Sequence, residues 1–253
     1  MKHLTILTGA SRGMGLALAS QLLAPDAVLV CISRQSNAVL EREAQQARAM
    51  LEQWAMDLAN GAPVAARLGD WLLAQDPSSM ASATLINNAG VISDLVPLRD
   101  ANPGDLAHAL RVGLEAPMQL CAAFLGATQH WQMPRKVLNI SSGLGRCAMA
   151  SSSAYCAAKA GMDHFTRCLA LDEALQPNGA KVCSLAPGVI DTDMQLQLRG
   201  ADADAFPDRA AFQGLHSQGQ LTSPAEAALR ILRYLTRSDF GGQPVADVRE
   251  AAP

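Results

Sequence analysis

The chain has 253 residues, of which 49% are hydrophobic and 17% are charged, and its formal net charge is −3. A hydrophobic fraction of this size supplies a buried core and excludes an intrinsically disordered chain. Lys and Arg are scattered along the sequence instead of forming the basic face or tail of a nucleic-acid binder, so we expect no nucleic-acid partner.

Apolar or β-branched segments alternate along the chain with amphipathic ones. Strands are expected at Leu4–Thr8, Ala27–Ser33, Leu51–Met56, Ala83–Asn88, Lys136–Ser141, Lys181–Ala186 and Pro244–Val248. Apolar residues three and four apart predict helices at Met14–Leu23, Val39–Met50, Val64–Leu73, Ala154–Leu175 and Ala225–Leu235. This alternation predicts a single α/β domain over residues 1–253, a doubly wound Rossmann-type parallel sheet of about seven strands with helices on both faces.

Two segments bear on location and on substrate access. Ala116–Pro134 carries no formal charge, but a proline, three glutamines and a histidine interrupt it, so it is typical of a buried or interface helix and not of a membrane span. The chain starts almost directly with a strand-like run, which predicts no targeting segment and a cytoplasmic protein without membrane association. Residues 193–221 are broken by glycines and a proline and are expected to form an irregular substrate lid.

The six cysteines, at positions 31, 121, 147, 156, 168 and 183, form no CxxC pair. Their spacing also differs from that of metal ligands, so we expect no metal site. Mostly apolar neighbours predict buried, reduced thiols.

A glycine-rich turn, Thr8-Gly9-Ala10-Ser11-Arg12-Gly13-Met14-Gly15, joins the first strand to the first helix. Gly9 permits a tight turn, while Gly13 and Gly15 remove side chains where a pyrophosphate would approach backbone amides at the helix N-terminus. The spacing differs from the commoner G-x-G-x-x-G, so this motif alone leaves an ordinary glycine-rich turn open.

Three further motifs follow in order: Asn87-Asn88-Ala89-Gly90, Tyr155-x-x-x-Lys159 and Pro187-Gly188. With the glycine turn, they make the chain resemble the short-chain dehydrogenase/reductase family from about Leu4 to Val248. The resemblance implies a nicotinamide cofactor and oxidoreductase activity. The cofactor contacts that it implies are Gly9, Ser11, Arg12, Gly13, Met14, Gly15, Arg34, Asp57, Leu58, Asn88, Ala89, Gly90, Tyr155, Lys159, Pro187, Gly188, Ile190 and Thr192.

Charge at the end of the second strand favours NADP(H) over NAD(H). An NAD site needs a carboxylate there for the ribose 2′-hydroxyl, and the sequence Cys31-Ile32-Ser33-Arg34-Gln35-Ser36 has none. Arg34 stands where a 2′-phosphate would lie, and Arg12 could reach the same phosphate from the other side. The alternative is that both are solvated surface arginines.

Tyr155 is the expected proton donor to a carbonyl oxygen. Lys159 lies four residues later, which places the phenol and the ammonium on one helix face. We expect the cation to lower the phenol's pKa by about three units. Ser142 ends the preceding strand and matches the family's substrate-orienting serine, whereas the side chain of Ser141 points to the opposite side. A hydrolase is disfavoured because the serine lacks a G-x-S-x-G elbow and triad partners.

Gly113 departs from the family pattern. Most members carry an asparagine at this place, and its side chain helps to hold a water that links the lysine to solvent. Glycine is compatible with an irregular helix but supplies no hydrogen-bonding side chain, so we expect a water to replace the amide.

The sequences 186–195 and 242–247 look most like those of sepiapterin reductases and bacterial benzil (1,2-diketone) reductases. Sepiapterin reductases hold the pterin with an acid near the C-terminus; here that place falls on Ala246, with Asp247 one residue away, so pterin recognition is open. The expected substrate contacts are Leu144, Met149, Met194, Leu198 and Phe206, although each of them also suits a hydrophobic core. Together they would form an apolar pocket. Such a pocket favours a hydrophobic ketone or vicinal diketone as the small-molecule carbonyl substrate.

Two other classes of function remain open from the sequence. Gly113 motivates an NADPH-binding regulatory or sensor protein with little turnover. A structural or interaction protein on an inherited fold would bind no cofactor. The segments near Leu106–His130 and Ala154–Leu175 resemble the family's subunit interface, so we expect a homodimer or homotetramer.

Overall fold

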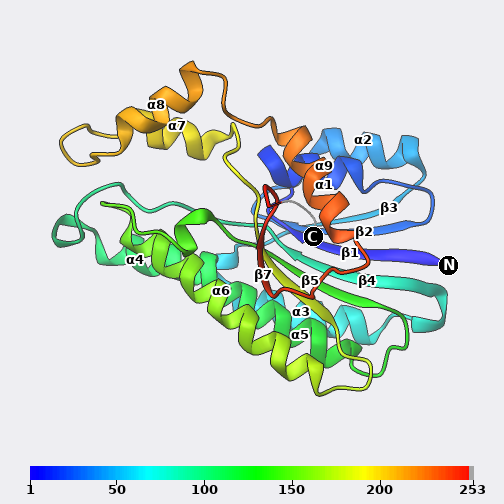
Figure 1. Ribbon diagram of the computed structural model, residues 1–253. Helices are drawn as coiled ribbons and strands as arrows, with labels where there is room; N and C mark the ends of the chain where they lie inside the picture. The colour runs from blue at the N-terminus through cyan, green and yellow to red at the C-terminus, as the bar shows by residue number, and fades with distance from the viewer. Residues whose placement is uncertain (251–253) are drawn as a thin grey trace.

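Seven parallel strands form one sheet in the order β3-β2-β1-β4-β5-β6-β7 (Figure 1). The computed structural model describes residues 1–250. The strands are β1 (Lys2–Thr8), β2 (Ala27–Ser33), β3 (Met50–Ala55), β4 (Met80–Asn87), β5 (Arg135–Ile140), β6 (Lys181–Ala186) and β7 (Val245–Asp247). The strand order reverses between β1 and β4, which is where a doubly wound sheet opens a ligand crevice. The predicted fold class is confirmed.

Helices cover both faces of the sheet, as Figure 1 shows. One face carries α3 (Gly61–Leu73), α4 (Pro103–Leu110), α5 (Ala116–Thr128) and α6 (Ser153–Ala174), and the other carries α1 (Gly13–Gln21), α2 (Ala38–Ala47) and α9 (Pro224–Leu235). Successive strand side chains point to opposite faces. Leu4 and Ile6 therefore join the core that contains Phe124, whereas Leu7 joins the core that contains Leu18 and Ile231.

Short 3₁₀ segments lie at Leu58–Asn60, Pro77–Ser79, Leu98–Asp100 and Gly143–Gly145. A π-helical turn, Arg111–Glu115, joins α4 to α5 and contains Gly113. The helix is thus irregular at the position where the sequence departs from the family pattern. The predicted buried helix after Ala116 is confirmed by α5, which buries Leu120 and Phe124.

Residues 193–221 are called the lid below, and they are more regular than the sequence suggested. They form α7 (Asp193–Gly200) and α8 (Arg209–Ser217), which stand away from the sheet beyond the carboxyl ends of the strands (Figure 1). Gly200 ends α7, and Gly219, with φ of +65°, follows the end of α8. The expectation of an irregular segment was wrong because these breakers mark the ends of two short helices.

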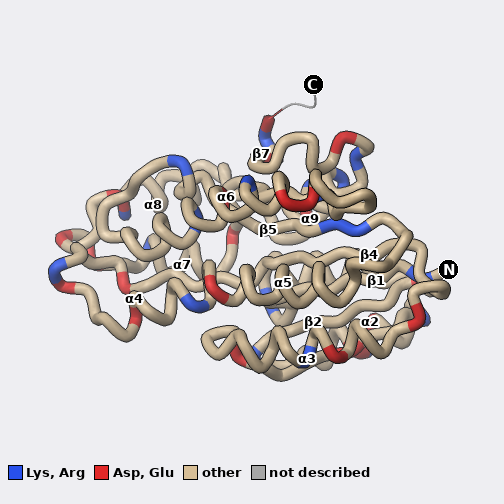
Figure 2. Tube along the Cα trace, turned by 90° about the horizontal axis from the view of Figure 1, so that it is seen from below, with Lys and Arg blue, Asp and Glu red and all other residues tan. Residues whose placement is uncertain are grey.

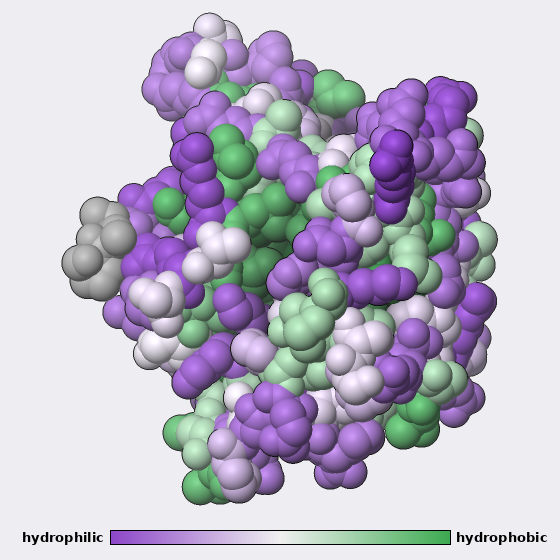
Figure 3. All heavy atoms as spheres, turned by 90° about the vertical axis from the view of Figure 1, so that its right-hand side faces the viewer, coloured by the Kyte–Doolittle hydropathy of each residue, from purple (hydrophilic) through white to green (hydrophobic). Residues whose placement is uncertain are grey.

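Charges of both signs are distributed over the trace (Figure 2). The face at the amino ends of the strands is mainly hydrophilic, with apolar residues exposed near its centre (Figure 3). Within residues 1–250, no helix is both long and apolar enough to cross a membrane.

The cysteines divide into buried and exposed thiols. Cys31, Cys121 and Cys183 are buried, and burial raises the pKa of the first two to about 12. Cys147 and Cys168 are exposed, so the expectation of uniform burial was wrong for these two. Among the described residues, no group of three potential metal ligands comes together.

Candidate active site

A cleft of about 1090 Å³ lies at the carboxyl ends of the strands. Typical small-molecule pockets measure roughly 300–1,000 Å³, so this cleft has room for a dinucleotide together with a substrate. All the predicted cofactor contacts line it, as do Ser142, Tyr155 and Lys159. The fold thus brings residues from the whole length of the chain into one place.

The glycine turn is shaped by backbone geometry at the start of α1. Gly9 and Gly13 have φ angles of +70° and +55°, which favour glycine. A Cβ atom on Gly15 would overlap the Gly9 carbonyl oxygen, so packing within the turn itself requires this glycine. Arg12 provides no side-chain cap to α1, which leaves the first helix amides without a side-chain acceptor. An uncapped helix N-terminus behind such a turn fits a phosphate group.

Asn88 fixes the turn to the neighbouring strand. The Thr8 hydroxyl oxygen accepts hydrogen bonds from the backbone amides of Asn88 (2.9 Å) and Ala89 (3.0 Å). The Asn88 side-chain amide donates to the Thr8 carbonyl oxygen at 2.9 Å. The ends of β1 and β4 are therefore held together at the strand-order reversal, and this side of the cleft is rigid.

The other end of the glycine turn carries two exposed arginines. Arg34 follows β2 and lines the cleft, while the Ser33 hydroxyl accepts from the Ala10 amide at 2.8 Å. Arg12 Nη1 lies 2.8 Å from the Asp193 carboxylate, and both side chains are more than 60% exposed. The structure thus places both arginines at the cleft, with Arg12 paired to the first residue of the lid.

The two serines after β5 point in different directions. Ser141 is buried, and its hydroxyl donates to Asp163 Oδ1 at 2.6 Å. Ser142 caps the 3₁₀ turn Gly143–Gly145, where its hydroxyl accepts from the Leu144 amide, and it lines the cleft. Both serines line the cleft, but the Ser141 hydroxyl is bonded to Asp163, whereas Ser142 forms a hydrogen bond with Tyr155.

Tyr155 and Lys159 come from the first turns of α6 and are both buried. Lys159 Nζ donates to the Ile140 carbonyl oxygen at 2.6 Å and lies 5.7 Å from the centre of the Tyr155 ring. Burial raises the pKa of Tyr155, and a hydrogen bond with Ser142 opposes this effect. The expectation of a lowered pKa for Tyr155 was wrong, because burial is the largest cause of its shift and acts upward. The phenol is protonated at neutral pH and can donate its proton.

Asp163 is a buried carboxylate one helical turn beyond Lys159. Its Oδ1 also accepts from the Ser184 hydroxyl at 2.7 Å, and its Oδ2 lies 3.5 Å from Arg146 Nε. Burial lowers the pKa of Lys159 to about 8, and the charge of Asp163 acts against this shift. Asp163 therefore supports the charged form of the lysine.

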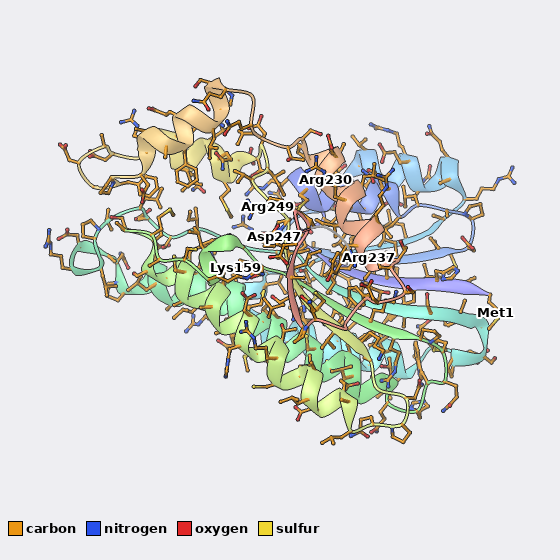
Figure 4. The ribbon with its side chains drawn as sticks, in the orientation of Figure 1. Met1, Lys159, Arg230, Arg237, Asp247 and Arg249 are labelled. Atoms are coloured by element: carbon orange, nitrogen blue, oxygen red, sulfur yellow. The ribbon has the colours of Figure 1, made fainter. Side chains whose placement is uncertain are left out.

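Asp247, the acid nearest the expected pterin anchor, is already engaged. Its carboxylate forms a double hydrogen bond with Arg249, at 2.6 and 2.9 Å, and only 5% of the residue is exposed. The bond to Arg249 lowers the pKa of Asp247. Asp247 and Arg249 are both labelled in Figure 4. Arg249 lines the cleft, whereas Asp247 lies outside the lining.

Gly113 packs directly against α6. A Cβ atom on this residue would lie 3.0 Å from the Ala158 Cβ atom. The water expected to replace the missing amide at this place stays a prediction. From the preceding turns of the same helix, His108 and Val112 reach the cleft.

The predicted substrate contacts are partly in place. Leu144, Met194 and Leu198 line the cleft. Met149 lies outside the lining, and Phe206 is fully buried in the lid, where it stacks on Phe212 at 5.8 Å. Sequence reasoning missed Val91, Ile92, His108, Val112, Gln195, Gln197, Phe212, Leu215 and Arg249. The three-residue spacing of the apolar pair on α8 was a usable signal, whereas Arg249 gave none.

The family model described as "short chain dehydrogenase" matches residues 3–203. The chain belongs to this family. A "Benzil reductase ((S)-benzoin forming)" of Bacillus cereus is 33% identical over 93% of this chain and 94% of the relative. A sepiapterin reductase of Meriones unguiculatus is also 33% identical, over 93% and 92%.

Solved structures agree with this assignment. A short-chain dehydrogenase/reductase from Burkholderia vietnamiensis is 32% identical over 99% of this chain and 100% of that chain, with a TM-score of 0.65. Structures of similar fold include complexes with NAD and with NADP.

Proposed function

We propose that this protein is an NADPH-dependent carbonyl reductase that transfers hydride to a ketone or vicinal diketone. The observation that carries the proposal is the convergence of Ser142, Tyr155 and Lys159 on the cleft that also contains the glycine turn. The names of the benzil and sepiapterin reductase relatives support a carbonyl substrate.

The bound cofactor would supply a hydride to the carbonyl carbon, which leaves negative charge on the oxygen. Tyr155, whose phenol burial keeps protonated, donates its proton to that oxygen. The Ser142 hydroxyl holds the same oxygen by a hydrogen bond. Lys159, held by the Ile140 carbonyl oxygen, places a positive charge behind the phenol as the oxygen is protonated.

Arg34 supports NADPH over NADH because it is exposed in the cleft after β2, where a 2′-phosphate would lie. We expect the NADPH to NADH ratio of kcat/KM to fall by about 10- to 100-fold in Arg34→Ala. Arg42→Ala, an exposed arginine of α2, is the control. Equal kcat/KM with the two cofactors in the wild-type enzyme would reject the preference.

An apolar substrate suits the pocket better than a pterin. Leu144, Met194 and Leu198 line its wall, and Asp247 is held by Arg249 and so is not free to anchor a ring nitrogen. We therefore place hydrophobic vicinal diketones first.

The test is steady NADPH consumption, read by absorbance, with benzil, sepiapterin and simple aryl ketones. Tyr155→Phe keeps the ring but removes the proton donor, and we expect about a 10²- to 10⁴-fold loss of kcat/KM. Tyr234→Phe is the matched control, since Tyr234 lies on α9 outside the cleft lining. Activity retained in Tyr155→Phe would defeat the proposal.

A second candidate is an NADPH-binding regulatory or sensor protein with little turnover. The observation that favours it is the position of Gly113 in the π-helical turn against α6, because glycine supplies no hydrogen-bonding side chain there. Tight NADPH binding without consumption on the whole ketone panel would select it.

We also propose a homodimer or homotetramer built on α5 and α6. These helices expose Met118, Leu171 and Leu175. Light scattering tests this, and a monomer would reject it.

A further inference from the structure

Gln195 is a buried amide in the wall of the cleft. Only 5% of the residue is exposed, although it lines the cleft. Within residues 1–250, its Oε1 atom has no hydrogen-bond partner and is shielded from water. A buried acceptor without a donor opposes folding, so its presence calls for a role that the folded chain alone does not show.

The usual structural role of a glutamine at this place does not apply. Gln195 lies in the first turn of α7, three residues after the N-cap Thr192, where a glutamine side chain often bonds back to the N-cap amide. Here the backbone amide of Gln195 donates to the Thr192 carbonyl oxygen at 2.9 Å. The side-chain oxygen takes no part in capping.

Gln195 differs from the other polar residues of the lid wall, Asp193 and Gln197, in being buried among apolar neighbours. Met194 and Leu198 line the cleft beside it on α7, and Phe212 and Leu215 line it from α8. The reacting carbonyl would be held by residues of β5 and α6, which are separate elements of the same cleft. An amide in the lid wall is therefore suited to an oxygen near the reacting carbonyl, not to the carbonyl itself.

We propose that Gln195 binds a second oxygen on the carbon next to the reacting carbonyl, which makes vicinal diketones and 2-hydroxyketones the preferred substrates. An amide serves both classes, since Oε1 accepts from a hydroxyl and, after a half-turn, Nε2 donates to a carbonyl oxygen. This inference rests on the proposed function and names the substrate class of the same site.

The experiment uses three substrates that share two phenyl rings: benzil has a second carbonyl, benzoin a hydroxyl, and deoxybenzoin neither. In Gln195→Leu, we expect kcat/KM to fall by about 10- to 100-fold for benzil and benzoin and to change by less than about threefold for deoxybenzoin. Gln218→Leu is the control, because Gln218 is also a lid glutamine but is exposed and lies outside the cleft lining. It should leave all three values unchanged.

Thermal melting separates recognition from a structural role. Since Oε1 makes no bond in the folded chain, we expect Gln195→Leu to melt within about 3 °C of the wild-type enzyme. If the Gln195→Leu variant does not fold, Gln195→Met offers an unbranched side chain of similar length. It is tested by the same ratio of kcat/KM for benzil to kcat/KM for deoxybenzoin.

Three results overturn the inference: an equal loss on all three ketones, an unchanged benzil to deoxybenzoin ratio, or a much lower melting temperature in both variants. Each leaves the reductase proposal standing if the wild-type enzyme reduces the ketones. If the wild-type enzyme reduces none of the panel, the proposed function fails and the inference fails with it.

Discussion

The two walls of the cleft are built in different ways. The wall at β1 and β4 is fixed by hydrogen bonds of Asn88 and Thr8 and by glycines that have no room for a side chain. The lid wall consists of α7 and α8, which stand away from the sheet and pack on their own small core around Phe206. Backbone geometry therefore determines the first wall, and side-chain packing determines the second.

This difference explains where sequence reasoning succeeded. A residue type such as glycine reports a backbone constraint directly, so the glycine turn was readable. A buried phenylalanine in a lid can point into the cleft or away from it, and only the packing of two helices decides. Phe206 was assigned to the cleft and lies inside the lid.

The largest effect is expected from Gly15→Ala in the rigid wall. The new methyl group would overlap the Gly9 carbonyl oxygen and lie 2.5 Å from Asn88 Nδ2, so the turn must shift. We expect NADPH affinity to fall about 100-fold or more, as for an overpacked site of several kcal/mol, measured by fluorescence titration. Gly126→Ala is the control, since nothing lies within 4 Å of its Cβ position. Unchanged affinity would show that the first wall is not rigid.

A smaller and more local effect is expected from Phe206→Ala in the lid. It removes a fully buried ring that stacks on Phe212. Because the lid stands apart from the sheet, we expect kcat/KM for the ketone to fall about tenfold while the Kd for NADPH stays within about twofold. Phe206→Leu should recover most of the activity. An equal loss of cofactor affinity would mean that the two walls are one unit.

Asp163→Asn tests how the buried carboxylate of Asp163 affects the pKa of Lys159. Burial lowers the pKa of Lys159 to about 8, and the Asp163 carboxylate raises it, with Arg146 as the other charged group facing that carboxylate. Without the negative charge the lysine loses its proton at lower pH. The alkaline limb of the kcat/KM profile should therefore move down by about one pH unit. Ser184→Ala is the control, because it removes a hydrogen bond to Asp163 but no charge. The alkaline limb of its kcat/KM profile should stay at the wild-type pH.

The smallest effect is expected from Asp193→Asn, which breaks the ion pair between Arg12 and the lid. Both side chains are mostly exposed, and such pairs are worth little in solution. We expect NADPH affinity to change by less than about threefold, with Arg12 freed toward a 2′-phosphate. The difference should vanish at high salt. A tenfold change would show that this contact couples the two walls.

Much of the fold and of the candidate site could be predicted from the sequence. The alternation of strands and helices indicated the doubly wound sheet because a parallel strand pair requires a crossover. Strand alternation indicated that Ser141 and Ser142 point to opposite sides, and the resemblance to the family selected Ser142. The bond between Ser141 and Asp163 agrees with this difference. The glycine turn could be predicted from local backbone demands, whereas Asn88, which bonds to Thr8 and Gly9, was indicated by the resemblance to the family.

Other features depended on contacts between distant segments. The pKa of Tyr155 rises because the folded chain buries the phenol, whereas the spacing to Lys159 suggested the opposite direction. The pairing of Asp247 with Arg249, and of Arg12 with Asp193, is set by where the C-terminal segment and the lid come to lie.

The sequence by itself determined the class of fold and the glycine turn, because these depend on periodicity and on short-range backbone geometry. Only the tertiary structure decided which lid residues face the cleft, how the catalytic groups titrate and which amide is left without a partner. Those properties depend on contacts between residues that are far apart along the chain, and local sequence spacing does not predict such contacts.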